Sequence, residues 1–280
     1  MSINSFIPAI WSGLILAELE KNLVYGSCVN RDHEGNMVGD TVYINEIGDI
    51  DISNYTKNST SLTYQTLDSA QQSFKVDQVK SFSFKIDDVD AAQSSAPVLT
   101  AAVKKAVATL SDEVDQYIST FYSTAGVTAS LGTTDSPIEI NSTNVVNYLL
   151  KLQRALDDVS CPETGRFVVV PPWFNEDILL SGAPGYFQPV GDLVNGICGR
   201  MAGFDIKKSV NVPNTAGDAY KIIAGSTDAI TFAMKIESLE ALRLEDSFSD
   251  AIRGLFNYGA LVQQPAALAV LTVNEATEAE

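Results

Sequence analysis

The stretch DDVDAAQSSAPVLTAAVKKAVATLSDEVDQYISTFYSTAG, residues 87–126, decides the fold of this chain. From Ser95 to about Ser123 its apolar residues recur at steps of three and four, which predicts an amphipathic helix. Ser95 is placed as an N-cap, Pro97 lies in the first turn and Gly126 ends the run. At ~1.5 Å per residue the helix is roughly 40 Å long, so it needs a surface to lie on. The predicted buried stripe is Leu99, Val103, Ala106, Leu110, Val114, Tyr117 and Phe121, and the predicted polar face is Lys104, Lys105, Ser111, Asp112, Glu113, Asp115 and Gln116.

The composition limits the class of protein. The 280 residues, 45% of them hydrophobic, suffice for one elaborate domain or two modest ones with a real core. A net charge of −17 and a pI near 4.3 argue against a protein that adheres to phosphate backbones or anionic membranes. Three widely spaced cysteines, Cys28, Cys161 and Cys198, predict free thiols in a reducing compartment and no structural zinc site.

The N-terminal residues carry an apolar run that could be mistaken for a signal peptide. The run has no basic start, contains Pro8 and turns acidic at Glu18 and Glu20, so it predicts a short amphipathic helix from about Pro8 to Leu23. No window approaches the ~18 apolar residues of a membrane span. We therefore expect a soluble protein that stays inside the cell in which it is made.

The segment between this helix and the long helix alternates with period two at both ends, which predicts a pair of β arms. Residues 54–61 between the arms are polar and rich in turn formers, and residues 62–67 form a third short strand or the distal end of an arm. Arms of about twenty residues would reach on the order of 60 Å, and an isolated ribbon of that length is marginal in water. It needs either its own folded-back subdomain or another subunit. The alternating residues are Val42, Ile44, Ile50 and Ile52, then Phe74, Val76, Phe82, Phe84 and Ile86.

The second half of the chain has an α/β pattern. A linker (123–137) precedes a helix that Ser142 caps and that ends at Asp158, with Val145, Leu149, Leu152 and Leu156 inward. A strand RFVVVPP, a short helix (173–180), a glycine-containing loop (182–203) and further short strands complete a compact unit, roughly 138–232. The last segment returns to strands that we expect beside the long helix, with Pro265 at a strand edge or bulge.

Motifs for catalysis are scarce. His33 is the only histidine and lies in a polar loop, RDHEGN, where a solvated side chain is the simpler interpretation. No GxSxG, GxGxxG or GxxxxGK motif occurs, so Gly196, Gly199 and Gly203 read as turn glycines, and aromatic residues lack the interleaved basic residues of a nucleic-acid reader. Carboxylates that could bind a hard cation, and that capping or solvation also explains, are Asp87, Asp88, Asp90, Asp246 and Asp250. These patterns indicate a protein that is not an enzyme and that acts by contacting copies of itself.

The order of these parts resembles the major capsid (coat) protein of tailed bacteriophages, an α+β fold shared with encapsulins and the herpesvirus capsid floor. Local matches include DDVDAAQ, RFVVVPP followed by DILL, AGFDIKKSVNVP, and IRGLFNYGALVQQPAALAV with Arg253, Gly254, Tyr258, Gly259, Pro265 and Leu268 in the typical pattern. The resemblance implies an N-terminal arm (1–38), an extended β-hairpin loop (39–86), a peripheral domain with the spine helix (87–137), an axial domain (138–232) and returning peripheral strands with a polar tail (233–280).

The resemblance also implies a function. Hexamers and pentamers of the chain would form a closed icosahedral shell with scaffolding protein, portal protein and a possible decoration protein, and the shell would enclose double-stranded DNA in the virion after assembly in the host cytoplasm. It implies no cofactor, metal or membrane. Some members of the family cross-link a loop lysine to a peripheral asparagine, for which Lys57 and Asn257 are candidates, although no glutamate base can be assigned. Candidate residues for contacts between subunits are Tyr55, Lys57, Asn58, Tyr64, Lys104, Arg253 and Tyr258.

Three other functions stay open at this point. An encapsulin-like compartment with a protein cargo has the same fold. A cytoplasmic hydrolase would use His33 or an acidic metal site. A tail or adhesin component is disfavoured because the long helix lies between a β ribbon and an α/β unit and no repeats accompany it.

Overall fold

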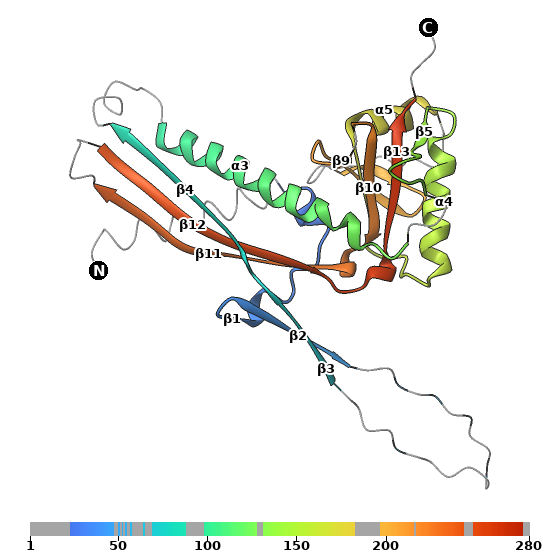
Figure 1. The fold of residues 1–280 in the computed structure, drawn as a ribbon, viewed down its shortest axis with the longest axis horizontal. Coiled ribbons are helices and arrows are strands. Elements are labelled where there is room, and N and C mark those ends of the chain that lie inside the picture. Colours follow the sequence, from blue (N-terminus) through green and yellow to red (C-terminus); the bar gives the residue numbers. More distant parts are fainter. Residues whose placement is uncertain are drawn as a thin grey trace.

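The computed structural model describes residues 23–47, 50, 52, 54, 57, 64, 69–87, 98–127, 131–182, 197–215, 217–243 and 249–276. Figure 1 shows three parts: a long helix along a three-stranded sheet, a narrow ribbon that leaves this sheet, and a second unit built on a seven-stranded sheet. The α+β class is confirmed. The predicted helix 8–23 falls almost wholly outside the described residues.

The long helix α3 (Val98–Ser119) continues as a 3-10 turn, η3 (Thr120–Thr124), so the predicted run to about Ser123 is nearly right. The predicted division of its faces is wrong at two positions, because Ser111 and Asp115 are buried, each with 2% exposure. The Ser111 hydroxyl donates to the Val107 carbonyl at 2.9 Å, so it needs no water. The side chains buried on this face are Val107, Leu110, Ser111, Val114, Asp115, Ile118 and Ser119, with Tyr117 and Phe121 half-buried at its edge.

The sheet under α3 has the order β11-β12-β4, and both pairs are antiparallel. Tyr258 of β12 meets Tyr117 of α3 edge to face with ring centres 5.3 Å apart. The Lys80 ammonium group of β4 donates a hydrogen bond to the Glu113 carboxylate of α3, with 2.6 Å between Nζ and Oε2. The expectation that returning strands lie beside the long helix is confirmed for two of them, since the strands are β4 (Gln78–Asp87), β11 (Ile230–Arg243) and β12 (Ser249–Val262).

The ribbon is the antiparallel pair β2 (Thr41–Ile47) and β3 (Ser69–Lys75), with the short β1 (Met37–Val38) on its edge. β3 leads directly into β4, so the ribbon grows out of the larger sheet (Figure 1). The period-two prediction is confirmed at its base: Val42, Ile44, Phe74 and Val76 are buried together with Ala233 of β11. The strand expected at 62–67 lies outside the described residues except for Tyr64.

The seven-stranded sheet has the order β5-β13-β10-β6-β8-β7, with β9 paired to β10. Helices α4 (Val145–Asp158) and α5 (Pro172–Leu180) pack beside each other at this sheet, and the four predicted inward residues of α4 are fully buried. Ser142 is not the cap, because Asn144 occupies that position and the side-chain oxygen of Asn141 accepts from the Asn144 main-chain amide. The strands are β5 (Ile138–Ile140), β6 (Arg166–Val170), β7 (Ile197–Met201), β8 (Phe204–Lys208), β9 (Asn214–Thr215), β10 (Ala219–Ser226) and β13 (Leu268–Glu275).

Two expectations for this part are corrected. Residues 182–203 were expected as a loop, but β7 lies within them, and it bulges at Gly199, where the register against β8 shifts. Residues 268–275 were expected with the peripheral strands, but β13 pairs with β10 and with β5. Pro265 begins a 3-10 turn, η5 (Pro265–Ala267), and does not lie in a strand, because the chain turns there from one sheet into the other.

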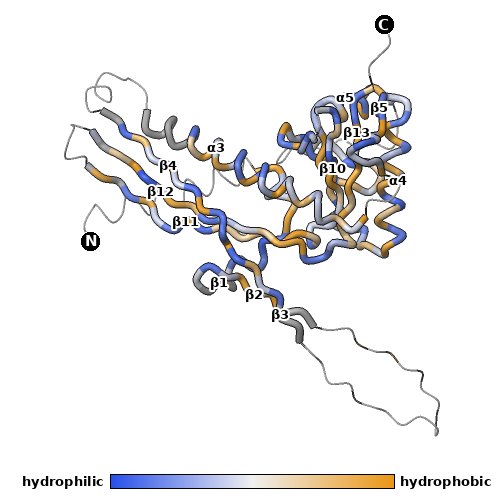
Figure 2. Tube along the Cα trace, in the orientation of Figure 1, coloured by the Kyte–Doolittle hydropathy of each residue, from blue (hydrophilic) through white to orange (hydrophobic). Residues whose placement is uncertain are grey.

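The two units share one hydrophobic core. In Figure 2 apolar residues are dense in the strands of the seven-stranded sheet and recur along α3. One cluster of buried side chains runs from α3 into the seven-stranded sheet, and the ribbon has a separate small cluster. Within the part of the chain described, no helix has both the length and the apolar character that a bilayer crossing requires.

Candidate functional site

The ribbon is held to the sheet by close packing at a glycine. A Cβ atom on Gly259 of β12 would lie 2.8 Å from the Lys75 carbonyl oxygen and 2.9 Å from Val76 Cα. Both neighbours are main-chain atoms, so only glycine lets β12 pass this close to the end of β3. The Val76 amide also donates to the Asp40 carbonyl at 2.8 Å, which closes the base of the ribbon. The glycine of the sequence pattern NYGA therefore positions the extended loop.

Beyond this base the ribbon offers apolar side chains to its surroundings. Ile50 is 67% exposed, Ile52 is 98% exposed and Tyr64 is 89% exposed. Apolar side chains that stay exposed to water do not gain the free energy of burial, which is about 25 cal/mol for each Å² of apolar surface. Three exposed apolar side chains therefore lie among the described residues of one extended loop.

The predicted contact residues fall into three groups. Lys57, Tyr64 and Lys104 are exposed, and Tyr55 and Asn58 lie outside the described residues. Arg253 is exposed and pairs across the strands with Glu240.

Tyr258 is 2% exposed and packs inside the subunit against Tyr117 and Phe256, so it is a core residue and does not reach a neighbour. Asn257, the cross-link candidate, has a buried side-chain oxygen that finds no hydrogen-bond partner among the described residues.

Sequence reasoning missed the junction where the N-terminal arm meets the body. Asp115 of α3 accepts hydrogen bonds from the amides of Val24 at 2.9 Å and Gly26 at 3.2 Å, and Lys207 of β8 donates to the Ser27 hydroxyl at 2.7 Å. Burial raises the pKa of Asp115 from 3.8 to about 6, against the lowering effect of these amides. One carboxylate and one ammonium group thus fix residues 24–27 between the helix and the seven-stranded sheet.

Cys28, Cys161 and His33 are described side chains of the types that serve as catalytic nucleophiles and bases. Burial raises the pKa of the Cys28 thiol to about 11 and also raises that of Cys161, so both are protonated at neutral pH and poor nucleophiles. His33 is half-buried in the turn before η2 (Glu34–Asn36). Across the described residues no three histidine, cysteine or acidic side chains converge as metal ligands.

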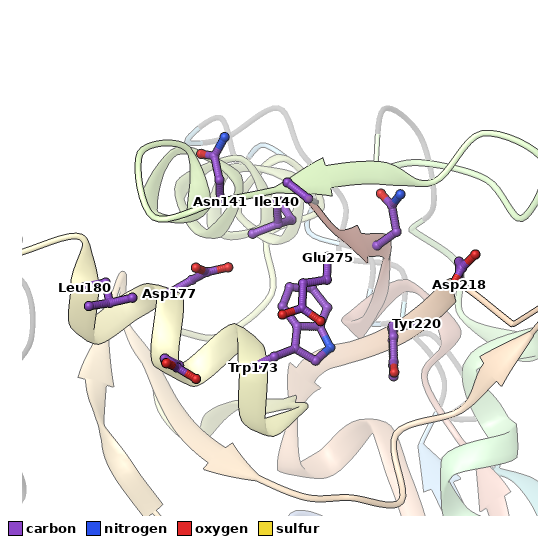
Figure 3. Close-up of a pocket in the computed structure, with 11 residues that line it drawn as sticks. Ile140, Asn141, Trp173, Asp177, Leu180, Asp218, Tyr220 and Glu275 are labelled. Atoms are coloured by element: carbon purple, nitrogen blue, oxygen red, sulfur yellow. The ribbon is translucent and has the colours of Figure 1, made fainter. Parts of the chain in front are cut away.

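A pocket opens at the end of the seven-stranded sheet near the C-terminus (Figure 3). We call it the tip pocket; its volume is about 630 Å³, and α5, the ends of β10 and β13, and the residues around β5 line it. Trp173 and Tyr220 form an aromatic wall with ring centres 5.5 Å apart. The carboxylates around it are Glu176, Asp177, Asp218 and Glu275.

No known protein-family model matches this sequence, and no curated protein matches it either. Solved structures do match. A chain of Mycobacterium phage Che8 is 25% identical with a TM-score of 0.64, covering 89% of this chain and 90% of that chain. A chain from the capsid structure of cyanophage P-SCSP1u is 16% identical with a TM-score of 0.63, covering 85% of each chain.

A third similar structure is the virus-like particle from Pyrococcus furiosus. Its chain is 14% identical with a TM-score of 0.57, and the match covers 95% of this chain and 99% of that one. The similarity therefore extends over nearly whole chains and includes the helix, the ribbon and the seven-stranded unit. The chain has the coat-protein fold of tailed bacteriophages, and in fold and in order of parts it resembles their major capsid proteins.

Proposed function

We propose that this chain is the major capsid protein of a tailed bacteriophage and that it assembles into the icosahedral head around double-stranded DNA. The observation that carries the proposal is the ribbon with its exposed distal apolar side chains, Ile50, Ile52 and Tyr64. Among the described residues the ribbon buries side chains only at its base, and a second subunit would cover the exposed ones. The similarity to capsid structures supports the same role.

The parts of the structure take the following roles in this proposal. The seven-stranded unit is the axial domain, which meets its copies around the symmetry axes. The helix α3 and the β11-β12-β4 sheet are the peripheral domain, and the ribbon of one subunit lies over this domain of the next. Because these contacts join different surfaces, they must close by rotation to give pentamers and hexamers.

The charge of the chain fits a container for DNA. A net charge of −17 gives the shell an acidic wall, which repels the phosphate backbone and does not trap it. Scaffolding protein and portal protein are the expected assembly partners, with a decoration protein on the outside. We place the chain in the virion, after assembly in the host bacterial cytoplasm.

The test is assembly of the purified full-length chain. Negative-stain microscopy and velocity sedimentation should show closed shells or rings at micromolar concentration, with or without added scaffolding protein. A chain that stays a folded monomer under all these conditions would refute the proposal. Deletion of residues 54–61, which the sequence predicts between the two β arms, should leave the subunit folded but reduce joining of rings into shells. Normal particle yield from this deletion would contradict the role of the ribbon.

An encapsulin-like compartment is the second candidate, and the similarity to the Pyrococcus furiosus particle favours keeping it. The two functions differ in content. Double-stranded DNA in particles isolated from infected cells supports a phage head, and a packaged protein supports a compartment.

A further inference from the structure

The tip pocket is an acidic recess, and the described residues that line it include no lysine or arginine. The carboxylates of Glu176 in α5, Asp218 just before β10 and Glu275 at the end of β13 are exposed around it. The Asn274 side-chain oxygen in its wall is buried and finds no hydrogen-bond partner among the described residues. Carboxylate groups from three places in the chain surround one opening, and they can accept hydrogen bonds from positively charged donors such as lysine and arginine.

The spacing of the carboxylates argues against a metal ion as the ligand and favours the side chains of another protein. The carboxylates do not converge on one point, because no three acidic, histidine or cysteine side chains in the described part of the chain are close enough for a metal ion. A recess of about 630 Å³ has room for long side chains. Next to it, the end of α5 exposes Leu179 at 59% and Leu180 at 63%. Exposed apolar side chains with charged groups beside them are typical of a protein–protein interface.

The complementary surface lies on α4 of the same chain. Leu150, Lys151 and Arg154 share one outer face of this helix at steps of one, three and four residues, and Leu150 is 39% exposed. The partners of the two cations within the chain are weak. Lys151 Nζ lies 4.2 Å from the Tyr148 ring centre, and Arg154 lies 3.8 Å from Asp158 in a pair whose side chains are 82% and 69% exposed. Both cations are therefore available to a second molecule.

These cations cannot fill the tip pocket of their own chain. The pocket residue Asn141 lies just before α4, and the helix carries Arg154 nine residues beyond its first residue, Val145. At 1.5 Å per residue Arg154 lies roughly 14 Å and Lys151 roughly 9 Å along the helix, and each distance is longer than the side chain itself. Figure 1 shows α4 on the outer side of the unit. The match between the two surfaces can thus be made only between copies.

We propose that the tip pocket receives Lys151 and Arg154 from α4 of the neighbouring copy, with Leu150 packing on Leu179 and Leu180. The inference rests on the proposed shell function and names the charged contact that joins adjacent axial units around a symmetry axis. The contact joins different surfaces, so it repeats from subunit to subunit and closes as a ring. It also explains how a chain with a net charge of −17 brings its copies together around one axis.

Charge reversal on each side, and on both sides together, tests the contact. Glu176→Lys with Asp218→Lys should lower the yield of closed shells about tenfold or more, and Lys151→Glu with Arg154→Glu should do the same. A chain with all four changes should recover most of the yield, because the attraction is restored with its sign inverted. Glu163→Lys is the matched control. It makes one such acid-to-lysine change, half the charge change of the double variant, on an exposed side chain of the same unit at the opposite end of β6 from α5, and it should leave the yield unchanged.

Circular dichroism and unfolding of each variant separate assembly from folding, since all five positions are exposed. The inference would be overturned if charge reversal at Glu176 and Asp218 left the yield of shells unchanged. It would also be overturned if that reversal lowered the yield but reversal at Lys151 and Arg154 neither lowered it alone nor restored it in the combined variant. A free cation as the occupant would also overturn it. Trp11→Phe leaves Trp173 as the only tryptophan, so its fluorescence reports on the pocket of unassembled subunits. If a free cation is the occupant, spermidine should change this fluorescence in a saturable way, and NaCl at the same ionic strength should not. Failure of the unmodified chain to assemble would instead refute the proposed function on which the inference rests.

Discussion

The seven-stranded sheet and the ribbon bury their apolar side chains in opposite ways. All five residues of β6 are buried within the chain, and so are seven of the eight residues of β10. The ribbon buries Val42, Ile44, Phe74 and Val76 against Ala233 and then leaves Ile50 and Ile52 in solvent. The first region completes its core within the chain, while the second leaves apolar side chains of its described residues exposed. The comparison separates the part that makes the subunit fold from the part that we propose makes it assemble.

The largest effect is expected from a substitution that creates a cavity in the seven-stranded sheet. Phe204 of β8 has no exposed surface, so Phe204→Ala should lower the free energy of unfolding by about 3–5 kcal/mol. Val210→Ala, at a position 84% exposed on the following loop, is the control and should change it by less than about 0.5 kcal/mol. Urea unfolding of the unassembled subunit measures both. Similar values for the two variants would show that this sheet is not the stable core.

The arm junction should make stability depend on pH. Because burial raises the pKa of Asp115 from 3.8 to about 6, the folded subunit holds this proton more tightly than the unfolded chain does. The contribution of Asp115 is therefore full below about pH 4 and falls by about 2–3 kcal/mol as the pH rises through 6. The groups that face it are Tyr25, Cys28 and Asp112, and burial also raises the pKa of Tyr25.

Asp115→Asn isolates this contribution. The difference in unfolding free energy between the unmodified chain and this variant should decline from pH 4 to pH 6 and then level off. A difference that stays constant over this range would mean that the carboxylate is not buried at the arm junction.

A smaller effect is expected where the ribbon meets the sheet. Gly259→Ala places a Cβ against main-chain atoms of residues 75 and 76, so it should cost about 1–3 kcal/mol and increase amide exchange in β3. Gly35→Ala meets nothing within 4 Å and is the matched control. Hydrogen exchange by mass spectrometry locates the change. If exchange rises in β10 and not in β3, Gly259 does not hold the ribbon.

The smallest effect on the isolated subunit should come from the ribbon surface. Ile52 is 98% exposed, so Ile52→Ser should change the unfolding free energy by less than about 0.5 kcal/mol but lower the yield of shells. Ile44→Ser, at a buried position of β2, should destabilise the ribbon itself. A clear loss of subunit stability from Ile52→Ser would show that this residue is packed within its own chain.

Local pattern predicted the elements well and their partners poorly. The steps of three and four in α3 and α4, and the alternation of Val42, Ile44, Phe74 and Val76, follow from short-range geometry that the sequence displays directly. The final strand β13 was placed with the wrong sheet, because pairing with β10, some 50 residues earlier, leaves no local trace. β7 was missed because Gly199 at its bulge is indistinguishable from a turn glycine.

The contact surfaces show the same limit. Asp115 was expected in solvent, but main-chain amides 89 and 91 residues away satisfy its carboxylate in the interior. Tyr258 was expected at a subunit contact, and its position in β12 against α3 makes it core. The tip pocket could not be foreseen, because its acids come from α5, from the start of β10 and from the end of β13. Only the exposed aromatic and basic side chains of the ribbon were within reach of sequence reasoning.

The paired 3-10 turns at the junction of the two units have a mechanical consequence. The chain leaves β10 through η4 (Thr227–Ala229) and returns to β13 through η5, and the two turns touch. The Ala229 carbonyl accepts from the amides of Gln263 at 2.9 Å and Gln264 at 3.2 Å, while the strand ladders lie wholly on either side. A tilt between the units would disturb these two hydrogen bonds and also the hydrophobic core that runs from α3 into the seven-stranded sheet. We therefore expect the two units to move as one body.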